Sequence, residues 1–418
     1  MFKAYPRHSV DISSKEYKKI LTLLFSYKMF SGDYTSQFEL MFSDYINTHF
    51  SISMPSARLG LYALLKYFNF PEGSEAIITP FTHWSIFTVI KSCRLKPIFV
   101  DIDEHTYNIH PSLVKKHITR NTKLLILTHM WGQPCEMDVF VELKREFNIK
   151  IIEDCAMACG SNYNNKKVGS FGEASIFSFG KAKALSTFGG GMLCTDNVDI
   201  YEYIREFSAD FHYEKPSSLT IAMLNSILAN ILTRPHIFYF SMYPILRLFN
   251  MRDPYNPIEH KKDTSIILDE IPHSWKVKLS NIQAAVGIEQ LKRLDECNQK
   301  RIENARILNN ILSHIKDIGV PLAIPKAKHI YLYYAVLIKK KINIDTLREK
   351  LIALGVDSQL HELTTPRELK LFGFDSSDYP VFDNVSQNLL IIPNGIYLAA
   401  KDALYISNAF KRIVETFN

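Results

Sequence analysis

Short apolar runs alternate with amphipathic stretches through the middle of the chain. The runs stay apolar from end to end, which is typical of strands in a sheet that is covered on both faces. They predict strands at Ala76–Thr79, Pro97–Ile102, Leu124–Met130, Lys150–Asp154, Ser175–Phe179 and Met192–Thr195. Helical spacing of apolar residues predicts helices between them, at Ser85–Ser92, Pro111–Lys116 and Met137–Phe147. This alternation predicts an α/β domain with a mostly parallel central sheet flanked by helices.

The pattern changes in the last third of the chain. A long amphipathic helix is expected from Ser280 to about Leu312, followed by a strand at Ile330–Ile338 and a helix at Ile344–Leu354. These elements predict a smaller C-terminal α+β domain. We place the boundary near Pro272, with a large domain over residues 1–271 and a small domain over residues 272–418.

Residues 217–251 form an apolar segment with helical spacing. We expect helices there that pack on the body of the protein or on a partner subunit. A contact with a membrane surface is the less favoured alternative. A membrane span is disfavoured because Thr220, Asn225 and Asn230 interrupt the segment.

The charge and cysteine content narrow the class of protein. The net charge of +6 is spread over 418 residues without a dense Lys/Arg arm, which argues against nucleic-acid binding and suits anionic substrates. The six cysteines show no paired framework, and Met1–Ser14 lacks the apolar core of a signal peptide. We therefore expect a cytoplasmic protein of two or three domains.

Lys183 follows a predicted strand in the run Phe177–Lys183, and the glycines Gly189–Gly191 come shortly afterwards. Pyridoxal phosphate (PLP) chemistry requires a lysine amine for an imine and hydroxyl or N–H donors for the phosphate. Ser178 supplies a hydroxyl, and the glycines allow the backbone to approach the cofactor or a strand. By itself this pattern also fits two surface lysines in a turn, and Lys181 is a second candidate for the imine.

Two further features suit the same chemistry. Asp154 ends a buried strand, where a carboxylate can keep a pyridine nitrogen protonated, although a helix cap or a metal ligand would look alike. Ser56 precedes a predicted helix, whose free N–H groups can bind a phosphate even though Ser56 also fits an ordinary cap. Ligands of α/β sheets bind beyond the carboxyl ends of strands, so we expect Asp154, Ser178 and Lys183 to lie together.

An ordered set of motifs makes the interpretation specific. The chain resembles the DegT/DnrJ/EryC1/StrS family of sugar aminotransferases, which have the aspartate-aminotransferase-like fold (PLP fold type I). Similarity extends from residues 27–50 to the region of Pro393. It is carried by the runs Lys96–Asp103, His129–Asp138, Ile152–Ala156, Lys167–Gly172, Phe177–Lys183 and Ser280–Gly287.

The resemblance implies a role for each matching residue. Lys183 is the expected Schiff-base lysine, and the spacing from Phe177-Ser178-Phe179 favours it over Lys181. Because relatives that lost this lysine include sugar dehydratases, its presence implies transamination. Ser178, Ser56 and Ala57 are expected at the cofactor phosphate. Asp154 is expected at the pyridine nitrogen. His83 is expected to stack on the ring, and Trp84 is the alternative.

The family pattern also implies partners. It implies an amino acid donor, usually glutamate, a keto-sugar acceptor, often nucleotide-linked, and a homodimer whose active site lies between two subunits. The family asparagine that reaches the phosphate across this interface is replaced by Lys276, and the family arginine near the donor carboxylate is replaced by Lys278. As cations, Lys276 can replace the asparagine at the cofactor phosphate and Lys278 can replace the arginine at the substrate, although lysine cannot reproduce a bidentate guanidinium contact. Met157 and Gly189 replace a family glutamine and a family glutamate.

These departures leave several acceptors and functions open. His129 and His361 are candidates for the acceptor site. A metal site built from His129, Cys155 and Cys159 lacks a complete ligand set, so we expect no metal. The leading interpretation is amination of a keto-sugar for surface polysaccharide or a related amino sugar. The alternatives are amination of a keto-octulosonate or a lipid-linked sugar, PLP-dependent dehydration, and a PLP-binding regulator without enzymatic activity.

Overall fold

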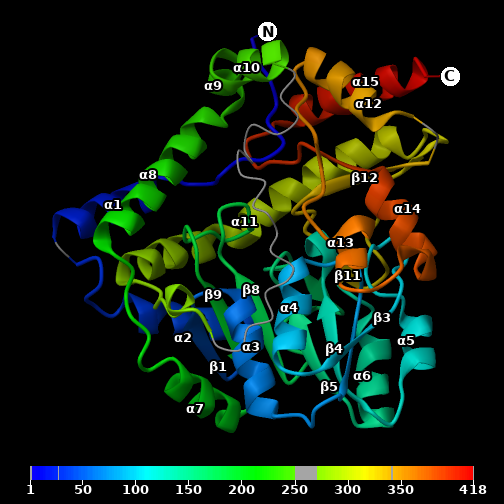
Figure 1. The fold of residues 1–418 in the computed structure, drawn as a ribbon. Coiled ribbons are helices and arrows are strands. Elements are labelled where there is room, and N and C mark those ends of the chain that lie inside the picture. The colour runs from blue at the N-terminus through cyan, green and yellow to red at the C-terminus, as the bar shows by residue number, and fades with distance from the viewer. Residues whose placement is uncertain (1, 27, 250–270, 340–341, 418) are drawn as a thin grey trace.

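The computed structural model describes residues 2–26, 28–249, 271–339 and 342–417. A seven-stranded sheet forms the centre of the large domain, in the order β1-β9-β8-β5-β4-β2-β3 (Figure 1). Five neighbouring strands are parallel, and β9 and β1 pair antiparallel at one edge. The predicted mostly parallel sheet is thus confirmed. Its strands are β1 (Phe50–Met54), β2 (Glu75–Ile78), β3 (Lys96–Phe99), β4 (Thr122–Thr128), β5 (Lys150–Asp154), β8 (Ala174–Ser178) and β9 (Gly191–Thr195).

Helices cover both faces of this sheet, as the apolar runs predicted. Along β4, Leu124 and Ile126 belong to the core under α3 and α4, while Leu125 and Leu127 belong to the core under α5 and α6. This alternation is the period-2 geometry of a strand buried on both sides. The helices of the large domain include α2 (Tyr34–Ile46), α3 (Ala57–Phe68), α4 (Trp84–Ser92), α5 (Pro111–His117), α6 (Met137–Phe147) and α7 (Val198–Phe207).

The long helix α11 (Asn281–Leu312) connects the two halves of the molecule (Figure 1). It packs on α1 (Ser14–Phe25) and α2, and also on the C-terminal helix α15 (Ala400–Glu415). Near the chain start, Tyr5 bridges to Val356 in the small domain. The domain limits themselves stay a prediction.

The small domain is built on an antiparallel sheet in the order β10-β12-β14-β13. Its elements are β10 (Ile318–Gly319), β12 (Tyr334–Ile338), β13 (Gln359–Leu360), β14 (Leu389–Ile392), α12 (Ile344–Ala353), α13 (Pro366–Leu371) and α14 (Pro380–Asn388). A separate three-stranded sheet consists of β6 (Asn162–Tyr163), β7 (Lys166–Lys167) and β11 (Ala327–Lys328).

The strand predicted at Pro97–Ile102 ends at Phe99 in the structure. Two other predicted strands differ at one end for a shared reason. The strand expected to begin at Ile330 begins at Tyr334, because the N–H groups of Ile330 and Leu332 donate to the carbonyls of Gly132 and Trp131. Strand β4 ends at Thr128 rather than Met130, since a 3-10 turn over Met130–Gly132 follows. Both differences come from one contact between the small domain and the loop after β4, which the local pattern does not reveal.

The apolar segment forms three helices: α8 (Pro216–Leu232), α9 (Pro235–Phe240) and α10 (Met242–Phe249). The inner side of α8 packs near α1 through Leu219 and Met223, while Phe238 and Tyr243 pack against Ala4. The predicted helices that pack on the body are present; residues 250 and 251 of the segment lie outside the described residues. Within the described part of the chain, no helix is long and apolar enough to cross a membrane.

Candidate active site

Three strand ends meet at one edge of the large sheet. In the register of the sheet, Ser178 of β8 lies opposite Gly191 of β9, and Gly191 lies opposite Met54 of β1. Gly191 has to be a glycine, because a Cβ there would lie 2.4 Å from the Phe177 carbonyl oxygen and 2.9 Å from the Ala57 nitrogen. The glycine run therefore lets the start of α3 approach the strand that carries Ser178.

Helix α3 begins at this edge and presents its N-terminus to it. Ser56 is the N-cap, and its Oγ accepts a hydrogen bond from the Leu59 N–H at 3.2 Å. The first N–H groups of an α-helix have no partner within the helix, and the helix dipole is positive at this end. Ser56 and Ala57 therefore border a ready-made site for an anion such as a phosphate.

Lys183 reaches the same place from the turn after β8. Its N–H donates to the Gly180 carbonyl oxygen at 3.1 Å. Burial lowers the pKa of the Lys183 amine, and the negative charges of Asp154 and Glu362 partly offset this effect. An amine with a lowered pKa is more often uncharged near neutral pH, which suits a nucleophile or a base. Lys181, two residues earlier, is exposed and does not line the cavity described below.

Asp154 ends β5 beside β8. Burial raises the pKa of its carboxyl group, while a hydrogen bond from the Ala156 N–H at 3.0 Å and the charge of Lys183 act in the opposite direction. A buried carboxylate is stabilised by a cation beside it. Asp154 is therefore suited to hold a protonated ring nitrogen.

These groups line one cavity with a volume of about 310 Å³. The structure brings together six of the residues predicted from the sequence: Ser56, Ala57, His83, Asp154, Ser178 and Lys183. His83 lines the cavity and Trp84 does not. The His83 Nδ1 forms a hydrogen bond with the Ser85 Oγ at 2.8 Å, which holds the imidazole ring in the cavity wall.

Arg58 also lines this cavity, and the sequence interpretation gave it no role. Its guanidinium lies 3.5 Å from the centroid of the Trp275 ring, and its buried Nε has no hydrogen-bond partner. Burial lowers the pKa of Arg58, and no acidic group among the described residues forms an ion pair with it. A buried cation without a counter-ion is costly, so Arg58 indicates that an anion binds here. Its position directly after the cap of α3 is the signal that could have found it.

Lys276 and Lys278 lie outside this cavity in the single chain. Lys278 lines a second cavity of about 240 Å³, which shares Ser56 and Arg58 with the first. The Lys278 Nζ donates to the Ala209 carbonyl oxygen at 2.7 Å. Lys276 lines neither cavity. The expected contacts of Lys276 with the phosphate across a subunit interface and of Lys278 with the substrate stay predictions.

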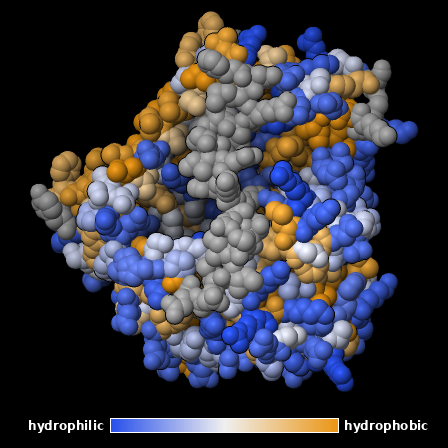
Figure 2. Space-filling model, in the orientation of Figure 1, coloured by the Kyte–Doolittle hydropathy of each residue, from blue (hydrophilic) through white to orange (hydrophobic). Residues whose placement is uncertain are grey.

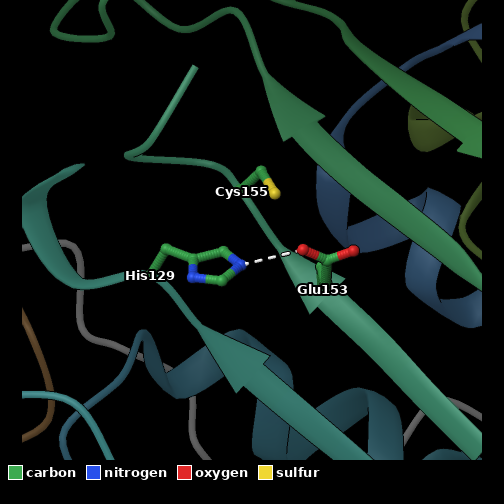
Figure 3. Close-up of side chains that lie close together, drawn as sticks. All are labelled: His129, Glu153 and Cys155. Carbon is green, nitrogen blue, oxygen red and sulfur yellow. Dashed lines mark hydrogen bonds and ion pairs between the residues drawn. The ribbon is translucent and has the colours of Figure 1, made fainter. Parts of the chain in front are cut away.

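His129 does not line the cavity; it follows β4, and its ring faces Glu153 of β5 (Figure 3). It is fully buried, its Nε2 donates to Glu153 at 3.1 Å, and its Nδ1 accepts from the Cys135 N–H at 3.0 Å. His129, Glu153 and Cys155 are close enough to hold a metal ion, with their ligand atoms within 4.8 Å. However, both ring nitrogens are used in hydrogen bonds, and burial keeps the pKa of the Cys155 thiol well above its usual range. The geometry suits a positioning role better than metal binding.

The small domain completes the cavity wall. His361 does not line the cavity; its Nε2 bonds to the Ser386 carbonyl oxygen at 2.8 Å. Its neighbour Glu362 does line it, together with Tyr333, whose hydroxyl donates to the Ala182 carbonyl oxygen at 3.0 Å. The sequence interpretation missed both residues, because their place in the site depends on how the two domains pack.

The cavity fits PLP by the chemistry of its groups. The N-terminus of α3, the hydroxyls of Ser56 and Ser178 and the unpaired guanidinium of Arg58 suit the phosphate. The amine of Lys183 suits the aldehyde carbon, and the carboxylate of Asp154 suits the pyridine nitrogen.

Comparisons with known proteins show which family the chain resembles. The sequence model of the DegT/DnrJ/EryC1/StrS aminotransferase family matches residues 10–220 and 244–411. An uncharacterized protein of Methanocaldococcus jannaschii is 30% identical over 410 residues, which cover 96% of each chain. The GDP-perosamine synthase of Escherichia coli O157:H7 is 33% identical over 206 residues, which cover 49% of this chain and 57% of that enzyme.

The fold is shared with a solved aminotransferase. The structure of Helicobacter pylori PseC, an aminotransferase involved in the biosynthesis of pseudoaminic acid, matches with a TM-score of 0.79 and 21% identity. The match covers 99% of this chain and 100% of PseC. The chain therefore belongs to the DegT/DnrJ/EryC1/StrS aminotransferase family, whose members are PLP-dependent aminotransferases.

Proposed function

We propose that this chain moves an amino group from an amino acid, with glutamate as the expected donor, to the keto group of a nucleotide-linked sugar. The observation that carries the proposal is the convergence of Lys183, Asp154 and Ser178 with the N-terminus of α3 on one cavity. Such a product is a building block for a surface polysaccharide or a related amino sugar. The relative named GDP-perosamine synthase supports a nucleotide-linked acceptor.

The cofactor and the chain divide the chemistry between them. When bound, PLP supplies an electron sink that stabilises negative charge on the carbon next to the nitrogen. Asp154 holds the proton on the pyridine nitrogen, which keeps that sink effective. Ser56, Ser178 and Arg58 bind the phosphate and so fix the position of the ring. His83 bounds one face of the site.

Lys183 has two roles. Its amine would hold the cofactor at the aldehyde carbon when no amino acid is bound, and once released it would move a proton to and from the reacting carbon atoms. Both roles require the uncharged amine, and burial supplies it by lowering the pKa of Lys183. Tyr333 and Glu362 of the small domain line the same cavity as this lysine.

The active site is proposed to be shared in a homodimer. Lys276 lies outside the cavity of its own chain, and the second cavity next to the anion site is lined by Trp275 and Lys278. A partner subunit that brings its own Lys276 to this region would add a second cation at the phosphate. The dimer is also the expectation from the family resemblance.

The test is the visible absorption spectrum of the purified protein with PLP, before and after addition of glutamate. We expect the band of lysine-bound PLP, which glutamate converts to the band of the aminated cofactor. Lys183→Ala should lose the first band. Lys181→Ala is the matched control, since it removes a lysine from the same turn but outside the cavity, and it should behave like the wild type.

Three results would contradict parts of the proposal. A wild-type protein without any PLP band would refute PLP binding at this site. Bound PLP that does not respond to glutamate, but responds to another amino acid, would refute glutamate as donor. Loss of water from a deoxy-sugar without transfer of nitrogen would identify a dehydratase instead.

A further inference from the structure

Helix α8 buries polar as well as apolar side chains and exposes a row of apolar ones. Ser226 and Asn230 are fully buried, beside the buried Leu219 and Met223. On the outward side, next to the exposed Asn225, four apolar residues are about half exposed, from 41% to 58%: Ile221, Leu224, Leu228 and Ile231. A surface helix normally turns such residues toward the core.

Hydrogen bonds of Asn230 fix this orientation. Its Nδ2 donates to the Val10 carbonyl oxygen at 2.6 Å and to the Tyr397 hydroxyl at 2.7 Å, and its Oδ1 accepts from the Tyr17 hydroxyl at 2.7 Å. A rotation of α8 that buried the leucines would leave these polar groups without partners. The outward apolar face is therefore a stable property of the fold.

The apolar surface continues onto the next two helices. Figure 2 shows hydrophobic residues along the flank occupied by α8 and over α9 and α10. Phe240 of α9 is 69% exposed and Leu248 of α10 is 79% exposed. We call Ile221, Leu224, Leu228, Ile231, Phe240 and Leu248 the apolar ridge. A surface of this kind on a folded protein marks an interaction site.

The charged residues within the helices that carry the ridge are of one sign. Residues 216–249 contain Arg234 and Arg247 and no aspartate or glutamate. Both arginines are exposed and form no ion pair among the described residues. A helix surface with apolar and cationic residues but no acidic ones is complementary to an anionic lipid surface, where aromatic residues such as Phe240 lie at the headgroup level.

The centre of the ridge lies outside the shared features of the family. The family model matches residues up to 220 and again from 244, so residues 221–243 are not part of it. The ridge is therefore not explained by the common catalytic fold. A second copy of the chain fits it less well, because a two-fold interface places the same patch opposite itself and would bring the arginines together without a counter-ion.

We propose that α8, α9 and α10 form a peripheral docking surface for anionic membranes. The ridge inserts its apolar side chains at the level of the headgroups, and Arg234 and Arg247 contact the lipid phosphates. Docking is independent of the catalytic cavity, so it is expected in the presence and absence of PLP.

The test is co-sedimentation of the full-length protein with vesicles. We expect binding to vesicles of phosphatidylcholine mixed with phosphatidylglycerol, weaker binding at high salt, and little binding to pure phosphatidylcholine. The double variant Leu224→Lys/Leu228→Lys should lower the vesicle affinity by roughly tenfold or more, since each leucine loses its favourable burial. Arg234→Glu/Arg247→Glu should reduce binding to the anionic vesicles.

The matched control is Leu322→Lys/Leu371→Lys, which makes the same chemical change at two leucines that are 51% and 65% exposed in the small domain. It should bind vesicles like the wild type. Equal losses in the control and the ridge variant, or no binding of the wild type to anionic vesicles, would overturn the proposal. A wild-type oligomer that Leu224→Lys/Leu228→Lys dissociates, without any vesicle binding, would assign the ridge to contact between copies.

Discussion

His129 donates a hydrogen bond from its Nε2 to Glu153 across 3.1 Å, and both side chains are fully buried directly behind Asp154. Glu153 also accepts hydrogen bonds from the N–H groups of Gly169, Phe171 and Gly172. Burial acts to raise the pKa of Glu153, but these donors together keep it below its usual range. The carboxylate thereby ties the end of β5, next to Asp154, to the loop after β4 and to the loop at residues 169–172.

Replacement of His129 should therefore destabilise the fold and loosen the cofactor. His129→Ala leaves the buried Glu153 carboxylate short of one donor and Cys135 N–H without its acceptor, which costs about 1–3 kcal/mol of the free energy of unfolding. Chemical denaturation measures this change. His117→Ala, at an exposed histidine on α5, is the control and should change stability by less than about 0.5 kcal/mol. Equal stabilities of both variants would show that the buried pair carries little energy.

Arg58 should contribute to binding of the cofactor phosphate. Arg58→Ala is expected to weaken PLP binding by roughly tenfold to a hundredfold, because charge-assisted hydrogen bonds contribute about 1.5–3 kcal/mol. Titration of the apo-protein, followed by quenching of tryptophan fluorescence, measures the affinity. Pyridoxal, which lacks the phosphate, should bind the variant and the wild type equally. An unchanged PLP affinity with a raised KM for a substrate would assign Arg58 to that substrate.

Glu362 should set the pH range in which Lys183 reacts. Its negative charge favours the protonated amine and so raises the pKa of Lys183, against the larger lowering by burial. Removal of that charge in Glu362→Gln should lower the pKa further. Only the uncharged amine attacks the PLP aldehyde, so a plot of the PLP-binding rate against pH has a rising limb where Lys183 loses its proton. In the variant this rising limb should lie at lower pH. A limb that stays in place or moves to higher pH would contradict this assignment.

Gly191 should tolerate no side chain. A Cβ there would lie 2.4 Å from the Phe177 carbonyl oxygen, so Gly191→Ala has to push β9 away from β8 and from the start of α3. Such overpacking costs about 1–3 kcal/mol of stability, and it should also weaken PLP binding. Gly180→Ala is the matched control in the same region, because its Cβ would come no closer than 3.8 Å to another residue. Thermal unfolding of both variants measures the difference.

Local patterns were sufficient for the elements that carry the site. The apolar run Lys150–Asp154 is a strand with the predicted limits, and the predicted helix Met137–Phe147 also has those limits. Strand ends place Asp154 and Ser178 at one sheet edge, because parallel strands present their carboxyl ends together. The order of motifs then indicated the family, which the comparisons confirm.

The sequence by itself thus determined the fold class, the family and six of the residues that line the cavity. Only the tertiary structure decided which side chains face the cavity. Arg58 follows a cap that fits many helices, and its missing counter-ion is visible only once Trp275 packs against it. Glu362 and Tyr333 enter the site through packing of the small domain. The ridge on α8 depends on Asn230, whose distant partners Val10 and Tyr397 turn this side of the helix inward. Hydrophobic periodicity reports only on residues within one helix or strand. These contacts join residues far apart in the chain, so they form and contribute to stability only when the chain has folded.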